Sequence, residues 1–283
     1  MTNLQPDESN LETENQRLKK TALTRSPPER RIGFSTHIGR LRGKDEDSVI
    51  AAEVTSMYES MARKRILLLI ADGMGGQEGG EIASRIGASV TANSILEMLA
   101  TGDKIESSTY HEAFSQAVQH ANKEILDLTL NRTQFSGMGT TVSLAVIDGY
   151  YLHVAHVGDS RVYVVNQRTI KQVTKDHSYV QTLVDLGRIT VEQARNHPQK
   201  NIVTKVLGYY GEIQPDLTSL PLSDEDHILV CCDGLTFHVG DEEIKQIVLR
   251  NSNPQNACDE LVSLANERGG FDNISLALAS AKD

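Results

Sequence analysis

The chain has 283 residues and a formal net charge of −10 at neutral pH, with 39% hydrophobic and 23% charged residues. This length and composition are typical of one large or two small soluble domains that bury a real core. The acidic charge, the lack of tryptophan and the 5% aromatic content argue against binding to nucleic acid or anionic lipid. We therefore expect no nucleic-acid partner and no membrane partner.

The N-terminal segment is polar and ends in the sequence RSPPERR. Few apolar residues and a Pro-Pro pair predict a flexible tail over residues 1–31, with a short helix from Leu11 to Lys20. A regulatory docking segment is the alternative interpretation. The start contains no basic region followed by an apolar one, so it does not resemble a secretory signal. We expect a single globular domain over residues 32–283.

The first structured elements after the tail are strands. The stretches IGFSTHIG and DSVIAAE come first, and RILLLIA from Arg65 is apolar throughout, which predicts a strand buried on both faces. Its apolar core, Ile66 to Ala71, is too short for a membrane helix. Two helices are expected next, one from the spacing of Ile82, Ile86 and Val90. The second helix has a longer apolar stripe, which consists of Phe114, Val118, Ala121, Ile125 and Leu128.

The middle of the chain contains three strands, TTVSLAVID, YYLHVAHV and RVYVVNQ, joined by short turns that predict antiparallel pairing. A helix with a capping box, Thr190 with Gln193, follows, and HILVCCDG predicts another buried strand. The segment DEEIKQIVLR and the segment beginning at Pro254 are expected helices, and NISLALAS closes the chain as a strand. This order predicts an α+β fold with a mainly antiparallel sheet and helices outside it.

Acidic residues beside glycine recur where apolar strands meet loops. They are Glu46 and Asp47, Asp72 before Gly73, Asp159 after Gly158, Asp233 before Gly234, and Asp272 near Gly270. A single aspartate of this kind is usually a turn residue. Carboxylates that cluster at the ends of strands repel one another unless a cation lies between them, and oxygen ligands alone favour Mg²⁺ or Mn²⁺. Glycine lets the backbone approach closely, so the Gly73 carbonyl is a further candidate ligand.

Zinc is the alternative metal, and the sequence offers little for it. His153 and His156 are three residues apart on a strand, so they face opposite sides and cannot bind one ion together. The three cysteines, Cys231, Cys232 and Cys258, have no C-x-x-C spacing. We interpret them as small buried apolar residues in a reducing cytosol, which predicts a cytoplasmic protein.

Seven blocks resemble the bacterial branch of the metal-dependent (type 2C, PPM) serine/threonine protein phosphatases. In family order they are GRLRGKDED, LIADGMGGQEGGEIAS, GMGTTV, HVGDSRVY, VTKDHSYVQTLVDLGRIT, CCDGLTF and GGFDNIS, and the resemblance runs from about Ile32 to Ala281. It implies a four-layer αββα sandwich in which two antiparallel β-sheets are flanked by helices. It also implies that residues 32–283 form a metal-dependent protein phosphatase domain.

The resemblance also implies roles for individual residues. Asp72 would bridge two Mn²⁺ or Mg²⁺ ions, with the Gly73 carbonyl on one ion and Asp233 and Asp272 on the other. Glu46 and Asp47 would hold metal-bound waters or orient the ligands. Asp159 would help to bind a third, weaker ion, and Arg42 would grip the substrate phosphate. The implied reaction is hydrolysis of phosphoserine or phosphothreonine by a hydroxide that bridges the two ions, with Asp72 and Arg42 as the catalytic residues.

Two positions depart from the family pattern. Asp45 stands where the family commonly has Asn, and its extra charge would either tighten cation binding or repel phosphate. Met74 stands where some relatives have a histidine that protonates the leaving group, so a metal-bound water or a histidine of the flap would take that role. The segment from Lys175 to Tyr210 resembles this flap, with Gly187 and Gly208 as expected hinges. The Asn201 backbone is a weak candidate for the third ion.

The resemblance implies partners as well. The expected partners are phosphorylated proteins, including a serine/threonine kinase or its targets, and the expected state is a monomer in signal transduction. The alternative is a catalytically weak phosphatase-like regulator that binds phosphoproteins or partners. Such a regulator would be expected to lose a metal-binding aspartate or Arg42, and the sequence keeps all of them. A two-metal nuclease conflicts with the net charge of −10.

Overall fold

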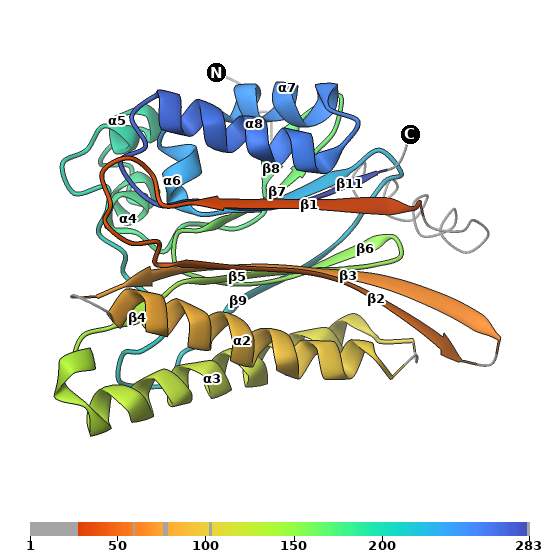
Figure 1. Cartoon of the computed structure of the whole chain (residues 1–283), viewed down its shortest axis with the longest axis horizontal. Helices are drawn as coiled ribbons and strands as arrows, with labels where there is room; N and C mark the ends of the chain where they lie inside the picture. Colours follow the sequence, from red (N-terminus) through yellow and green to blue (C-terminus); the bar gives the residue numbers. More distant parts are fainter. Residues whose placement is uncertain (1–27, 59, 76–78, 102–103, 282–283) are drawn as a thin grey trace, which may run out of the picture.

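Two antiparallel sheets pack face to face, and helices cover the outer face of each sheet, so the chain forms four layers (Figure 1). The computed structural model describes residues 28–58, 60–75, 79–101 and 104–281. The expected helix from Leu11 to Lys20 lies outside the described residues, as does most of the predicted tail. The first strand begins at Arg30, two residues before the predicted domain start. The predicted α+β sandwich is confirmed.

The first sheet follows the order β2-β3-β5-β6-β9, and a short strand, β4, also pairs with β3. Its strands are β2 (Asp47–Tyr58), β3 (Met61–Met74), β4 (Gly139–Thr140), β5 (Val142–Asp148), β6 (Tyr151–Val157) and β9 (Asp216–Pro221). In β3, Leu67 and Leu69 face the helices, whereas Leu68 and Ile70 face the other sheet. Burial on both faces explains why this run is apolar throughout.

The second sheet follows the order β1-β11-β10-β7-β8, with every pair antiparallel. Its strands are β1 (Arg30–His37), β7 (Arg161–Val165), β8 (Ile170–Gln172), β10 (His227–Cys231) and β11 (Ile274–Ala281). The core between the two sheets contains Ile228 and Val230 of this sheet together with Ile66 and Leu68 of the first. The two sheets are thereby held at a fixed separation by interlocking branched side chains.

The pairing expected across the middle of the chain is only half right. β5 and β6 pair as expected, but β7 leaves β6 and pairs with β10 and β8 in the other sheet. Gly158 adopts a φ of 113°, a conformation that favours glycine, and a Cβ there would lie 2.4 Å from the Thr141 side chain. This sharp turn carries the chain from one sheet to the other, so the short connection does not form a hairpin.

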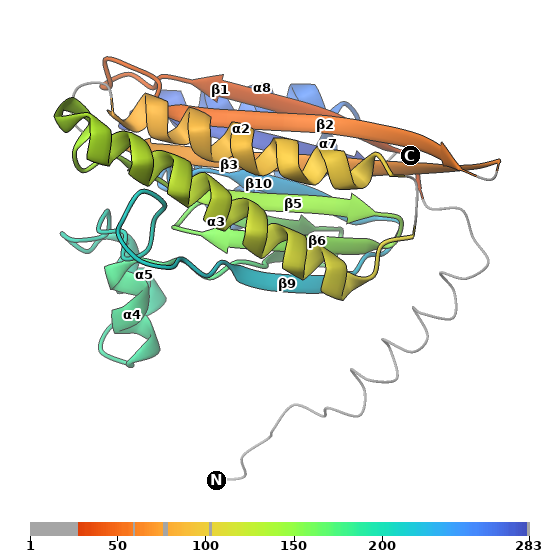
Figure 2. The same ribbon diagram turned by 90° about the horizontal axis from the view of Figure 1, so that it is seen from below.

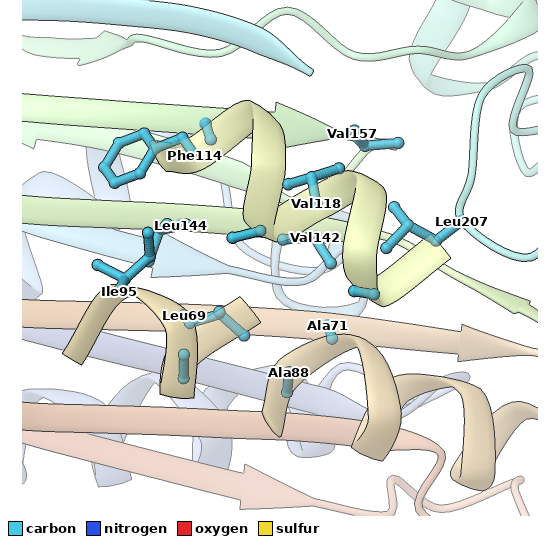
Figure 3. Close-up of a cluster of buried hydrophobic side chains, with 14 of the residues drawn as sticks. Leu69, Ala71, Ala88, Ile95, Phe114, Val118, Val142, Leu144, Val157 and Leu207 are labelled. Atoms are coloured by element: carbon cyan, nitrogen blue, oxygen red, sulfur yellow. The ribbon is translucent and has the colours of Figure 1, made fainter. Parts of the chain in front are cut away.

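Two long helices, α2 (Gly79–Leu99) and α3 (Ser107–Asn131), cover the first sheet (Figure 2). The α3 stripe is confirmed, and Phe114 and Val118 lie against the sheet with Leu69 and Val142 (Figure 3). The α2 helix buries mainly small residues such as Ala88, whereas the expected stripe residues Ile82, Ile86 and Val90 are only half-buried. Small residues allow α2 to approach β3 closely, which hydrophobicity alone does not reveal.

The second sheet is covered by α7 (Asp241–Arg250) and α8 (Pro254–Glu267), and Pro254 occupies the first turn of α8 as expected. Shorter helices occupy the connections: η1 (Thr133–Phe135), α4 (Tyr179–Asp185), α5 (Val191–Arg195) and α6 (Asp233–Thr236). The predicted capping box of Thr190 and Gln193 is present at the start of α5. Among the helices described, none is both long enough and apolar enough to cross a membrane.

One end of the sandwich collects loops and short helices from distant parts of the chain. The connection between β1 and β2 lies there with α4, α5 and α6, while the β2–β3 hairpin marks the opposite end (Figure 1). β2 begins at this end and β3 ends there, because the two strands are antiparallel. The acidic residues at these strand ends are therefore brought to one edge of both sheets.

Candidate metal centre

The centre is built on a carboxylate pair across two strands. Asp47 opens β2 and lies directly opposite Asp72 near the end of β3. Residues opposed in this way present their side chains on the same face of a sheet, roughly 5 Å apart at Cβ. Thr141 fixes the backbone of Asp72, since its hydroxyl accepts from the Asp72 N–H at 2.9 Å and its own N–H donates to the Asp72 carbonyl at 2.9 Å.

A cavity of about 200 Å³ lies beside this pair. It is lined by nearly all the predicted site residues: Arg42, Glu46, Asp72, Gly73, Asp159, Asp233 and Asp272. Asp47 does not line the cavity, because its carboxylate is buried within the protein. The structure thus brings together residues that span the chain from the loop before β2 to the loop before β11.

Burial and mutual repulsion both raise the pKa values of these carboxylates. Burial raises the pKa of Asp72 well above its usual range, and the charges of Asp47 and Asp233 raise it further. Burial likewise raises the pKa of Asp47 to about 8 and the pKa of Asp233 to about 7. The pKa of Asp159 is also raised well above the usual range, first by burial and then by Asp233. Such a cluster is stable near neutral pH only if it is protonated or compensated by positive charge.

The cluster fits a hard divalent cation. Both carboxylate oxygens of Asp47 are buried, and hydrogen bonds from the Ser275 and Cys232 side chains offset only part of the rise that burial causes in its pKa. A buried carboxylate that is only partly compensated is costly, and a cation removes that cost. The oxygens that line the cavity are the ligand type that Mg²⁺ and Mn²⁺ prefer. The observed donors therefore fit such ions, while their roles as ligands stay predictions.

Glycine is required at position 73 because the backbone of other residues lies very close to it. A Cβ at this position would lie 2.1 Å from the Gly80 carbonyl and 2.5 Å from the Glu46 carbonyl, both of which are backbone atoms. The Gly73 N–H donates to the Glu46 carbonyl at 3.1 Å, which joins β3 to the loop before β2. The need for glycine arises from this close contact, since Gly73 is not among the glycines with positive φ.

Asn273 holds the loop that contains Arg42 and Glu46. Its amide nitrogen donates to the carbonyls of Ile38 and Lys44, both at 2.9 Å, and its amide oxygen accepts from the Glu46 N–H at 2.8 Å. Asn273 lies in the GGFDNIS block, but its sequence pattern predicted no role for it. The one signal in the sequence was its position directly after Asp272, a candidate metal ligand.

Arg42 forms its ion pair with a candidate metal ligand. Its Nη2 lies 2.6 Å from Oδ2 of Asp272. This hydrogen bond raises the pKa of Arg42, which keeps the guanidinium charged. Its side chain is 49% exposed, which leaves it able to rotate toward a phosphate in the cavity.

Asp45 points its carboxylate at protein groups. Oδ2 accepts from the Thr36 hydroxyl at 2.7 Å, and Oδ1 accepts from the Asp47 N–H at 3.2 Å. It does not line the cavity. Asp45 therefore acts on the site through the start of β2, because it holds the backbone of Asp47.

Cys232 is a neighbour of the centre that no pattern in the sequence indicated. Its Sγ and carboxylate oxygens of Asp47 and Asp72 all lie within 4.8 Å of one another. Cys231 and Cys258 instead belong to the core beneath α7 and α8. Burial raises the pKa of the Cys232 thiol well above its usual range, and the carboxylates of Asp47 and Asp72 add to this effect. The interpretation of Cys232 as only an apolar core residue is therefore incomplete.

The segment that resembles the flap borders the centre. Asn201 and Met74 line the same cavity as Asp159. His177 does not line it, because its Nδ1 accepts from the Gly158 N–H at 3.0 Å and its Nε2 lies 3.1 Å from Asp216. His177 is thus held by two partners at the base of the segment, which leaves it poorly placed to act as an acid.

Two histidines of β6 confirm the argument against a histidine zinc site. Nδ1 of His153 lies 2.7 Å from the Ser219 hydroxyl, whereas Nδ1 of His156 lies 2.9 Å from the Ser143 hydroxyl. They lie on opposite faces of the sheet and share no partner. Burial lowers the pKa of each to about 4, so both stay neutral.

A second cavity, of about 350 Å³, adjoins the centre. It shares Asp159 and Asp233 with the first cavity, and its other walls come from α4, α5 and the segment after α6. Arg195 and Lys200 contribute positive charge to this wall. Asp176 and Asp241 line it as well, so this larger groove beside the centre carries charges of both signs.

This fold and centre define a class of protein, an αββα sandwich in which both sheets deliver carboxylates to a cavity at one end. The chain belongs to the protein phosphatase 2C family, since the model of that family matches residues 33–274. It is 35% identical over 253 residues to the protein phosphatase PhpP of Streptococcus pneumoniae, which covers 89% of this chain and 98% of the relative.

Two solved structures show the same architecture. The serine/threonine phosphatase PstP/Ppp of Mycobacterium tuberculosis superposes with a TM-score of 0.77 at 32% identity, over 90% of this chain and 99% of that chain. The catalytic domain of a serine/threonine protein phosphatase PstP in complex with two manganese ions has a TM-score of 0.75 at 31% identity, with the same coverage.

Proposed function

We propose that this chain is a metal-dependent protein phosphatase that hydrolyses phosphoserine and phosphothreonine in proteins. The observation that supports this most directly is the convergence of Asp72, Asp159, Asp233 and Asp272 with Arg42 around one cavity. The family assignment and the names of the relatives support the same activity. A non-catalytic regulator lacks support, because every residue predicted for catalysis is present at the cavity.

The carboxylates would hold the ions in the arrangement that the family resemblance implies. Asp72 would contact both core ions, the Gly73 carbonyl one of them, and Asp233 and Asp272 the other. Glu46 and Asp47 would orient these groups, and Asp159 would hold a third ion. When bound, such an ion pair activates a water molecule near neutral pH and stabilises charge on the phosphoryl group.

Arg42 would bind and orient the phosphate. A planar guanidinium donates two parallel hydrogen bonds to phosphate oxygens, which fixes the phosphorus relative to the carboxylate cluster. The chain has no C-x₅-R nucleophile motif, which agrees with direct hydrolysis without a phosphoenzyme. Met74 lines the cavity and has no proton to donate, so leaving-group protonation falls to another group.

The adjoining groove would hold residues that flank the phosphorylated side chain. It begins at Asp159 and Asp233 and continues along α4 and α5, where Arg195 and Lys200 favour acidic flanking residues. Phosphorylated proteins, including a serine/threonine kinase or its targets, are the proposed partners. The three buried free cysteines support a cytoplasmic location, and we propose that the protein acts there as a monomer in signal transduction.

An assay of phosphothreonine, phosphoserine and phosphotyrosine peptides in Mn²⁺, Mg²⁺ or chelator tests the function. We expect hydrolysis of the phosphothreonine and phosphoserine peptides with Mn²⁺ and no activity in chelator. The same assay compares the activity that Mg²⁺ supports with the activity that Mn²⁺ supports. Asp72→Asn should abolish activity, because Asp72 would contact both ions. Asp127→Asn, an exposed position on α3, is the matched control. Full activity in chelator, or a preference for phosphotyrosine, would contradict the proposal.

A further inference from the structure

His177 binds both backbone groups of Gly158, the residue before Asp159. The His177 N–H donates to the Gly158 carbonyl at 2.7 Å, and Nδ1 of its ring accepts from the Gly158 N–H at 3.0 Å. A turn that is held through both of its backbone polar groups has little freedom to rotate. The direction in which the Asp159 side chain leaves this turn therefore depends on His177.

Ser160, on the other side of Asp159, is held by the first sheet. Its hydroxyl lies 2.9 Å from the Thr141 hydroxyl, and its carbonyl accepts from the hydroxyl of Ser143 in β5 at 2.8 Å. His177 instead belongs to the segment that resembles the flap. Asp159 is thus fixed by a sheet on one side and by this segment on the other.

The ring of His177 has a defined position and a defined proton. Its Nε2 lies 3.1 Å from Oδ2 of Asp216, the first residue of β9, and the ring stacks on His156 with the centroids 4.8 Å apart. Because Nδ1 faces a backbone N–H, Nδ1 is the acceptor. The proton of the neutral ring therefore lies on Nε2, where it donates to Asp216.

The segment that resembles the flap reaches the metal cavity through residues next to a partner of His177. The Thr204 N–H donates to the His177 carbonyl at 2.8 Å. Asn201 and Val203 line the same cavity as Asp159. A shift of the chain around Thr204 would therefore act on His177, and through Gly158 on Asp159.

We propose that His177 is a positioning residue that fixes the Asp159 carboxylate in the metal cavity and couples it to the segment that resembles the flap. His177 does not line the cavity, so it acts through Gly158 and contacts neither ion nor phosphate. Residues that orient a metal ligand in this way contribute about 10- to 100-fold to metal affinity or activity. The inference rests on the proposed role of Asp159 toward a third, weaker ion.

Nitrogen-15 NMR of the unsubstituted chain near neutral pH is the first test and needs no variant. We expect the His177 ring to carry its proton on Nε2 alone, with Nδ1 as a hydrogen-bond acceptor. A proton on Nδ1 would overturn the proposal, because the ring could then not accept from the Gly158 N–H. This readout does not depend on any metal ion.

Two variants separate the contacts of the ring. His177→Asn places an amide oxygen close to the position of Nδ1 and keeps an acceptor for Gly158. His177→Gln places its amide close to the position of Nε2, so it keeps a donor for Asp216 but leaves the Gly158 N–H without its acceptor. His177→Gln should therefore weaken the third Mn²⁺ at least about tenfold and keep the two tight ions, whereas His177→Asn should resemble the unsubstituted chain.

Electron paramagnetic resonance of free Mn²⁺ during a titration measures the binding of each ion. Hydrogen exchange at the Gly158 amide, measured without metal, should be faster in His177→Gln and unchanged in His177→Asn. His197→Gln is the matched control, since Nδ1 of His197 also accepts a backbone N–H, that of Gln199 at 3.1 Å, but His197 does not line the metal cavity. This control should leave the third ion and the Gly158 amide unaffected.

The outcomes separate this inference from the proposed function. An equal affinity for the third ion in His177→Gln and the unsubstituted chain would overturn the role of His177. An equal loss in His177→Gln and His177→Asn would also overturn it, as would an unsubstituted chain that binds only two Mn²⁺. The proposed function stands in each case if the unsubstituted chain hydrolyses phosphothreonine peptide with Mn²⁺, and it fails if that chain is inactive with Mn²⁺.

Discussion

Asp47 of β2 lies directly opposite Asp72 of β3, so one rung of an antiparallel ladder holds two buried carboxylates. Like charges opposed across strands are unfavourable, and burial increases the penalty. The penalty is confined to the end of the ladder, while the following rungs pair apolar residues such as Val49 with Ile70. The apolar ladder positions a pair of groups that repel each other, and a cation bound between them would offset this repulsion.

The metal-free protein should lose stability as the pH rises. The ordinary pKa of an aspartate is about 3.9, whereas the folded protein raises that of Asp47 to about 8 and that of Asp233 to about 7. Between these limits the folded state binds more protons than the unfolded state, so the free energy of unfolding falls with rising pH. Urea unfolding across this window in chelator measures the slope.

Saturating Mn²⁺ should reverse this trend, because it binds the ionised carboxylates of the folded state. Stabilisation by Mn²⁺ should therefore grow with pH over the same window. In chelator, Asp47→Asn should make the unfolding free energy depend less on pH, because it removes one of the groups with a raised pKa. A metal-free protein whose stability rises with pH through this window would contradict the description of the cluster.

Arg42→Ala should reduce kcat/KM for a phosphopeptide by roughly 10- to 100-fold, equivalent to about 1.5–3 kcal/mol. The variant loses the charge-assisted hydrogen bonds to phosphate but no buried contact. Arg40→Ala, in the same loop and also exposed, is the matched control. Steady-state kinetics and a thermal melt would separate the two effects. An unchanged kcat/KM would leave Arg42 as a surface partner of Asp272.

Asn273→Asp should loosen the loop that presents Arg42. The change replaces the amide nitrogen that donates to two carbonyls, those of Ile38 and Lys44. Because both carbonyls are only partly buried, each one that loses its donor costs at most about 1–3 kcal/mol in the free energy of unfolding. We expect a higher KM for phosphopeptide with Mn²⁺ affinity largely kept, measured by kinetics and calorimetry.

Asn93→Asp, at an exposed position inside α2, is the control for this change. It should leave both the unfolding free energy and KM close to those of the unsubstituted chain. If Asn273→Asp shows a loss of stability with unaltered kinetics, Asn273 supports the fold without positioning Arg42.

Asp159→Asn should leave two tight Mn²⁺ sites, because Asp72, Asp233 and Asp272 remain. The amide keeps the shape of the side chain and removes one charge. Turnover should fall, and it should fall further for phosphothreonine peptides than for p-nitrophenyl phosphate, whose leaving group needs little protonation. Calorimetric titration with Mn²⁺ and kinetics on both substrates provide the measurement. An equal loss on both substrates would remove the leaving-group role from Asp159.

Local patterns in the sequence were sufficient to predict most elements and the acidic residues of the centre. The apolar run of β3, the capping box at Thr190 and the proline at the start of α8 depend on neighbours within a few residues, so they are visible in one stretch of chain. The carboxylates were identifiable because each follows or precedes a strand, and most of them stand close to a glycine. The family resemblance then supplied the roles that spacing alone leaves open.

Other features depended on contacts between residues far apart in the chain. The turn at Gly158 places β7 in the second sheet. The Arg42 guanidinium forms an ion pair with Asp272, and the Cys232 thiol lies near the carboxylates of Asp47 and Asp72. A local pattern records which face of a strand a residue occupies but not which strand lies opposite. That choice is made by the packing of both sheets around one core, where side-chain shape and burial decide which of many compatible neighbours actually meet.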